Sequence, residues 1–123
     1  AGTFVGTGRR LRKFNPHIKL VSFQPDSPFH GLEGLKHMES AIVPAIYDPT
    51  LADEDLRIAT ESAYRMVRRL AREEGMMAGI SSGAAMCAML TVARRLDRGV
   101  VVTVFPDGAE KYLTEKFWTA DEQ

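Results

Sequence analysis

Residues 83 to 93, GAAMCAMLTVA, leave this chain few choices of fold, because a helix over them is apolar on nearly every side. Such a helix has to be covered by other elements, which predicts a layered domain. Residues 100–105, VVVTVF, form a continuous β-branched and aromatic run. That run is typical of a parallel strand covered on both faces. We therefore expect an α/β fold with a mostly parallel sheet flanked by helices.

The first half of the chain adds a helix, two strands and an irregular segment. Apolar residues recur with helical period over 4–14, and Pro16 ends that helix because proline cannot continue it. Strands are expected at 18–23, IKLVSF, and at 54–59, EDLRIA. Between them, the prolines and glycines of residues 24–50 favour irregular structure. This alternation of helices and strands supports the α/β class.

Capping residues mark further helices in the second half. Thr60, as a hydroxyl N-cap, and Gly75, just past the end, bracket a helix over 60–74. Ser82 or its neighbour is expected to cap the buried helix that follows. A last short helix carries the apolar residues between 112 and 118.

Composition narrows the classes of function. The 123 residues allow one modest domain or a piece of a larger one, and a net charge of zero attracts neither nucleic acid nor an anionic membrane. No apolar run approaches the roughly 20 residues of a membrane span. Clusters of basic residues occur at helical spacing opposite apolar ones, which indicates solvated helix faces. They are Arg9, Arg10, Arg12 and Lys13; Arg65, Arg68, Arg69 and Arg72; and Arg94, Arg95 and Arg98.

Cysteine and histidine usage argues against a metal site. Cys87 is the only cysteine, which fits a reducing, cytoplasmic setting. It lies among apolar residues with no histidine or basic residue near it in sequence, so we expect it to pack as a hydrophobe. The spacing of His17, His30 and His37 matches no metal-ligand pattern.

The stretch AGISSGAA, residues 78–85, places serines and glycines directly before the buried helix. In open α/β sheets, ligands bind beyond the carboxyl ends of the strands, where helix N-termini present free N–H groups. Gly79 and Gly83 would let the backbone approach a ligand, while Ser81 and Ser82 offer hydroxyls. On these residues alone, plain N-capping by a serine stays an open alternative.

A second glycine-rich stretch, AGTFVGTG, opens the chain. Its spacing does not match G-x-G-x-x-G, so a nicotinamide cofactor is not supported. Gly2 and Thr3 at a helix N-terminus would suit a phosphate, which backbone N–H groups and a hydroxyl can bind. A tight turn with helix packing is the alternative.

Together with a third segment, these stretches carry a resemblance to a known family. AGTFVGTGRRL, EEGMMAGISSGAA and VFPDGAEKYL resemble, in order and spacing, motifs of the fold-type II pyridoxal-phosphate enzymes, specifically the cysteine synthase (O-acetylserine sulfhydrylase) and cystathionine β-synthase family. Lys111 stands where that family usually has arginine. The resemblance spans essentially the whole chain. It implies a tryptophan synthase β-like fold and pyridoxal 5'-phosphate as cofactor.

The resemblance also implies roles for particular residues. Gly2 and Thr3 match loop positions that bind the cofactor phosphate in the family. Ser81 matches the serine that hydrogen-bonds the pyridine nitrogen. A neutral hydroxyl at the positive end of a helix dipole would disfavour protonation of that nitrogen, which makes the ring a milder electron sink. Asp107, at the end of the last strand, is a candidate neighbour of the ring, or a cap of the final helix.

The family's Schiff-base lysine lies upstream of Ala1 in the family pattern. Residues 1–123 are therefore expected to be the C-terminal part of a β-replacement enzyme, and this chain alone is expected to lack catalysis. The resemblance implies that the N-terminal portion of the same enzyme is a partner. It also implies a homodimer in the cytoplasm.

Residues 25–56 look most like the cysteine synthase B branch. Lys36 stands where several such enzymes have an arginine that meets an anionic substrate group, although lysine lacks the planar fork of arginine. The implied activity is a transferase reaction that makes cysteine from O-acetylserine, or another activated serine, with sulfide or thiosulfate. Alternatives are a β-elimination or dehydratase activity, a cystathionine β-synthase-like activity, or a non-catalytic α/β binding module.

Overall fold

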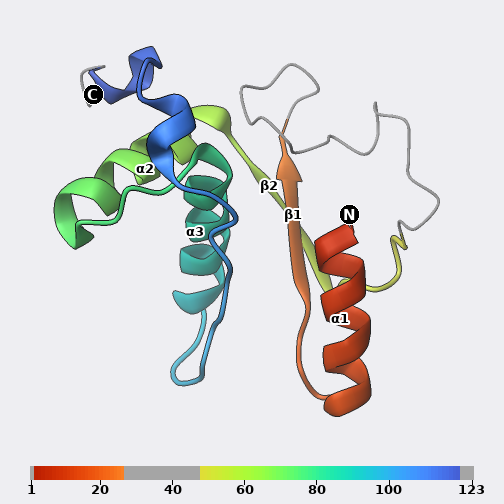
Figure 1. Cartoon of the computed structure of the whole chain (residues 1–123). Coiled ribbons are helices and arrows are strands. Elements are labelled where there is room, and N and C mark those ends of the chain that lie inside the picture. The colour runs from red at the N-terminus through yellow and green to blue at the C-terminus, as the bar shows by residue number, and fades with distance from the viewer. Residues whose placement is uncertain (1, 27–47, 120–123) are drawn as a thin grey trace.

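The computed structural model describes residues 2–26 and 48–119 and confirms the α/β class (Figure 1). Two strands pair in parallel, and helices lie on both sides of them. The elements are α1 (Gly2–Phe14), β1 (Val21–Pro25), β2 (Glu54–Ile58), α2 (Thr60–Glu74), α3 (Ile80–Ala93) and the short 3-10 helices η1 (Ala109–Tyr112) and η2 (Lys116–Trp118). None of the helices in the described ranges is long and apolar enough to cross a bilayer.

The strand predicted at 18–23 is displaced toward the C-terminus. Pairing begins at Val21, opposite Glu54, because the backbone N–H of Leu20 donates to the carboxylate of Asp53 at 2.8 Å. The side chain of Asp53 thus takes the N–H of Leu20, while the carbonyl of Leu20 accepts from the N–H of Asp53 at 2.8 Å. The strand predicted at 54–59 is confirmed to within one residue.

A cluster around Asp55 joins alternate residues of the two strands on one face of the pair. Its carboxylate accepts hydrogen bonds from Ser22 and Gln24, each at 2.7 Å, and from Arg57. Partial burial raises the pKa of Asp55, but the hydrogen bonds together lower it by more. The pKa therefore lies below the ordinary value of 3.8. The strand pair is therefore stabilised by an ionised Asp55.

This shift predicts an acid-dependent loss of stability. A carboxyl group with a lowered pKa stabilises the fold above its unfolded pKa and loses that contribution as the pH falls through its folded pKa. We expect Asp55→Asn to destabilise the protein by about 1 kcal/mol at pH 7. The difference from wild type should shrink below pH 3.8. Urea unfolding at a series of pH values measures it, and a difference independent of pH would contradict the assigned cause.

The helix predicted over 60–74 is confirmed, and Gly75 ends it with a left-handed φ of 68°. The prediction of Thr60 as the N-cap is wrong, because Ala59 occupies that position and no side chain caps the helix. The first turn relies instead on the backbone, where the N–H of Ala63 donates to the carbonyl of Ala59 at 3.1 Å. A hydroxyl cap is therefore not needed here, because packing of the apolar face stabilises α2.

The core lies where α2 and α3 cross. Ala63 and Val67 of α2 and Ala84 of α3 are fully buried, and Ile58 of β2 closes the cluster. The first half of α3 is buried, as its sequence predicts, whereas its second half is half-buried in this chain.

The last described residues, up to 119, pack onto α2 through aromatic rings and a buried arginine. Phe117 stacks on Tyr64 with ring centroids 4.6 Å apart. Arg68 is only 6% exposed and donates to the backbone carbonyl of Phe117. The prediction that Arg68 belongs to a solvated face is therefore wrong. The predicted final helix is also replaced by two 3-10 turns, η1 and η2.

The predicted strand at 100–105 does not form in the described structure. Val100, Val102 and Val104 are 89, 82 and 67% exposed. A strand needs hydrogen bonds from a neighbouring strand, and no described segment pairs with these residues. The apolar pattern of 100–105 is thus present without the partner that would make it a strand.

Candidate functional site

The stretch that carries the two serines is held by a segment far away in the sequence. We call residues 78–82 the serine turn; it lies against residues 107–109 through an antiparallel bridge between Ala78 and Gly108. The flanking backbone hydrogen bonds are Gly79 N–H to Asp107 O at 3.1 Å and Ala109 N–H to Met77 O at 2.9 Å. These bonds fix the direction in which α3 begins.

The structure gives the two serines different environments. Ser82 is fully buried, and its hydroxyl donates to the carbonyl of Asp107 at 3.4 Å. Ser81 is half-buried, and its hydroxyl makes no hydrogen bond with any described residue. Neither serine caps α3, whose N-cap is Gly79 without a side-chain hydrogen bond, so the capping alternative is wrong. Ser81 is the hydroxyl left available to a ligand.

Asp107 packs directly on the serine turn. A Cβ atom at Gly79 would lie 1.9 Å from Oδ1 of Asp107, so only glycine lets the carboxylate approach this closely. Oδ2 accepts a hydrogen bond from the hydroxyl of Tyr112 at 2.9 Å, and Lys111 Nζ lies 3.9 Å away. Oδ1 is buried with no hydrogen-bond partner in the described structure. The residue before η1 is Gly108, so Asp107 does not cap that helix.

Gly2 and Thr3 form the first turn of α1. Both are exposed, no acidic residue lies in that turn, and a Cβ at Gly2 would meet nothing within 4 Å. In Figure 1, the N-terminal ends of α1 and α3 face the side on which the carboxyl ends of β1 and β2 lie. Free N–H groups of two helices therefore face the edge of the sheet where α/β proteins bind ligands.

A family model described as pyridoxal-phosphate dependent enzyme matches residues 1–107. The chain belongs to this family. Among the curated relatives of this chain, a cysteine synthase of Aquifex aeolicus (strain VF5) is 52% identical over 117 residues. The match covers 92% of this chain and 36% of the relative. A cysteine synthase B of Pseudomonas aeruginosa is 35% identical over 113 residues, covering 92% of this chain and 38% of the relative.

Solved structures agree with the family assignment. O-acetyl serine sulfhydrylase isoform 3 from Entamoeba histolytica superposes with a TM-score of 0.86 at 31% identity, covering 100% of this chain and 39% of that chain. The family resemblance and fold class predicted from the motifs are confirmed. The chain spans less than two fifths of the length of the two curated relatives, at 36 and 38%.

The described residues fit the cofactor that the family name implies. Pyridoxal phosphate presents an anion and a ring nitrogen, which call for N–H groups and a hydroxyl donor. Helix α1 offers its exposed N-terminus for the anion, and Ser81 offers a hydroxyl that no described residue occupies. The buried, unpartnered Oδ1 of Asp107 shows that the wall beside the serine turn is polar.

Other predicted residues fall elsewhere. Lys36, His30 and His37 lie outside the described residues. His17 is exposed, after the end of α1. The substrate contact predicted for Lys36 therefore stays a prediction.

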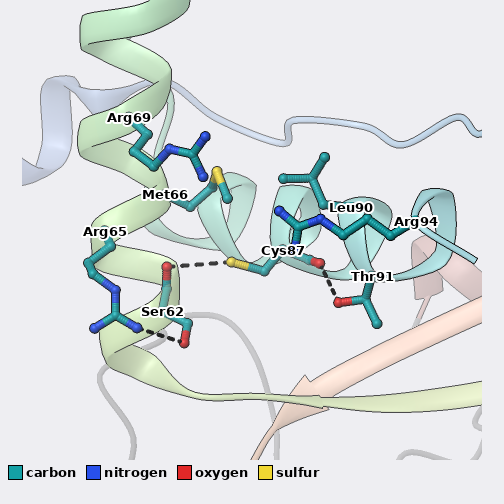
Figure 2. A pocket seen from close by; sticks show the side chains of 8 residues that line it. All are labelled: Ser62, Arg65, Met66, Arg69, Cys87, Leu90, Thr91 and Arg94. Atoms are coloured by element: carbon teal, nitrogen blue, oxygen red, sulfur yellow. Dashed lines mark hydrogen bonds between the residues drawn. The ribbon is translucent and has the colours of Figure 1, made fainter.

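Sequence reasoning missed the surroundings of Cys87. Burial raises the pKa of its thiol, as a packed cysteine requires, but Arg65, Arg69 and Arg94 each act to lower that pKa in part. Figure 2 shows these side chains around the sulfur, with Cys87 donating to the carbonyl of Ser62 at 3.4 Å. The available signal was the spacing of Arg65 and Arg69 on one face of the helix before Cys87.

Proposed function

We propose that this chain is the C-terminal part of a pyridoxal-phosphate dependent cysteine synthase that makes cysteine from O-acetylserine and sulfide. The observation that carries the proposal is the different surroundings of the two serines. Ser82 is buried in the fold, whereas the hydroxyl of Ser81, at the start of α3, has no hydrogen bond to any described residue. The identity of 52% to a cysteine synthase over most of the chain supports the choice of reaction.

The residues of this chain would bind and orient the cofactor, which when bound supplies an electron sink for reactions at the α- and β-carbons of an amino acid. Gly2 and Thr3 would hold its phosphate at the N-terminus of α1. The neutral hydroxyl of Ser81 would donate a hydrogen bond to the pyridine nitrogen, and the positive end of the α3 dipole would disfavour protonation there. Asp107 would keep the serine turn in place and border the ring.

The full-length protein provides the direct test. Purified with pyridoxal phosphate, it should form cysteine from O-acetylserine and sulfide. Replacing sulfide by thiosulfate, or by homocysteine, separates cysteine synthase B-like and cystathionine-forming activities. Failure to bind the cofactor at all would sink the proposal.

Ser81→Ala tests the residue that carries the proposal. We expect cofactor affinity and the rate of cysteine formation each to fall about tenfold, because a hydrogen bond to the ring is lost. Fluorescence titration with the cofactor and steady-state kinetics measure the two effects.

Ser82→Ala is the matched control. Its hydroxyl bonds only within the described fold, so we expect a loss of about 1 kcal/mol in stability with little change in rate. If Ser81→Ala kept the wild-type rate and affinity, or if Ser82→Ala produced the larger kinetic effect, the role assigned to Ser81 would be wrong.

The remaining parts of the proposal concern what lies beyond the described residues. We propose that Lys36 contacts an anionic substrate group and that the Schiff-base lysine belongs to an N-terminal portion of the same enzyme. The coverage of 36–39% of relatives by 92–100% of this chain supports the second point. A homodimer and a cytoplasmic location stay predictions.

A further inference from the structure

A pocket of about 310 Å³ opens between α2 and α3 (Figure 2). It lies along α3 about two turns beyond the serine turn, so none of the residues proposed for the cofactor lines it. Its lining residues are Ser62, Arg65, Met66 and Arg69 from α2 and Cys87, Leu90, Thr91 and Arg94 from α3. The volume is at the lower end for pockets that bind small molecules.

The ionisable lining of this pocket is strongly one-sided. Three arginines line it, and no acidic residue does. All three line the pocket together with Cys87, and each lowers the pKa of its thiol in part. Figure 2 shows Arg69 extending from α2 and Arg94 running back along α3, so that both guanidinium groups approach the space beside Cys87. Like charges gathered in this way repel one another unless an anion lies between them.

These arginines are only weakly satisfied by the protein. Arg65 makes a long hydrogen bond of 3.4 Å to the hydroxyl of Ser62. Arg69 uses Nε and one Nη on the carboxylate of Glu73, at 3.2–3.3 Å, in an exposed i,i+4 ion pair that solvent screens. Arg94 has no ion pair with any described side chain. Most of their donor capacity thus remains for a ligand.

The other walls define the shape of that ligand. The hydroxyls of Ser62 and Thr91 add polar groups, although that of Thr91 already donates to the carbonyl of Cys87 at 2.9 Å. Met66 and Leu90 supply an apolar side. A group that combines several anionic oxygens with a small apolar body matches these walls.

We propose that the α2–α3 pocket binds a multiply charged oxyanion, either inorganic phosphate or the phosphoryl group of a small monoester. Guanidinium forks bind phosphate oxygens two at a time, which selects this chemistry over a monovalent anion. None of the residues proposed for the cofactor lines this site, and the site does not depend on the proposed reaction.

Cys87 provides a readout that is independent of enzyme activity. A bound oxyanion would neutralise the arginines that lower the pKa of the thiol and would cover the sulfur, so alkylation should slow. We expect saturating phosphate to slow the reaction of Cys87 with iodoacetamide about tenfold in the full-length holoenzyme, at constant ionic strength set with chloride. Mass spectrometry of the peptide that contains Cys87 measures the rate. Tighter binding of phenyl phosphate assigns the site to a monoester, and equal binding assigns it to the free anion.

Variants decide whether the pocket is responsible. Arg69→Gln and Arg94→Gln should each weaken the phosphate effect about tenfold, whereas Arg10→Gln, an equal charge change on the exposed face of α1, should leave it unchanged. The alkylation rate of each variant with phosphate is compared with its own rate without phosphate, because removing an arginine also changes the pKa of the Cys87 thiol. No slowing in wild type, or equal slowing in all three variants, would overturn the proposal.

Discussion

Gly83→Val is expected to prevent α2 and α3 from packing and to abolish the folded state of this part of the protein. A Cβ at Gly83 would lie 2.5 Å from the carbonyl oxygen of Ala63 and 2.6 Å from Cγ2 of Val67. The first of these is backbone and cannot move without shifting α2, while Val67 is fully buried in the core. Overpacking of this kind costs about 3 kcal/mol or more, and valine adds two further methyl groups. Urea unfolding of the full-length protein, followed by circular dichroism, measures the loss.

Gly6→Ala is the matched glycine control. Gly6 lies inside α1, and a Cβ there would meet nothing within 4 Å. We expect this variant to be more stable than wild type by about 0.5–1 kcal/mol, because alanine loses less entropy than glycine in a helix. If Gly83→Val were as stable as wild type, the close contact of the two helices would not exist in solution.

Gly79→Ala is expected to weaken cofactor binding about a hundredfold, on the proposed function of the site. The new methyl group would overlap Oδ1 of Asp107 and press on the ring of Tyr112, where the nearest atom is 3.0 Å away. The carboxylate of Asp107 would have to turn away, which breaks the hydrogen bond that it accepts from Tyr112 and shifts the backbone that Gly79 N–H bonds to. Ser81 would then lose its position. Titration of the apoprotein with pyridoxal phosphate, followed by absorbance, gives the affinity.

Gly75→Ala separates this effect from general loss of stability. Gly75 ends α2 with a φ of 68°, so alanine there is strained and costs about 1 kcal/mol. Gly75 lies outside the serine turn, so the Gly75→Ala protein should bind the cofactor with the affinity of wild type. Equal affinities for Gly79→Ala and wild type would show that the position of Asp107 does not matter to the cofactor.

Local signals were sufficient where local physics decides the outcome. The apolar period over 60–74 and the glycine after it predict α2 almost to the residue, because amphipathic spacing and a left-handed cap are properties of neighbouring residues. The motif around the serines likewise predicted the family, since its residues are contiguous.

Errors arose where a distant residue supplies the missing partner. Asp53 takes the N–H of Leu20 and so delays the start of β1. Arginine is a residue type usually found at the surface, but Arg68 is buried because it donates a hydrogen bond to the carbonyl of Phe117. The difference between Ser81 and Ser82 is of the same kind, because it depends on which hydroxyl the carbonyl of Asp107 accepts from.

The order of the residues alone predicts an α/β protein, and the motifs around its glycine-rich stretches predict its family. Which serine is free, why Arg68 is buried and where β1 starts were settled by contacts between residues 25 to 49 positions apart. The physical reason is that periodicity and capping act within a few residues, whereas burial and hydrogen-bond satisfaction are properties of the packed chain.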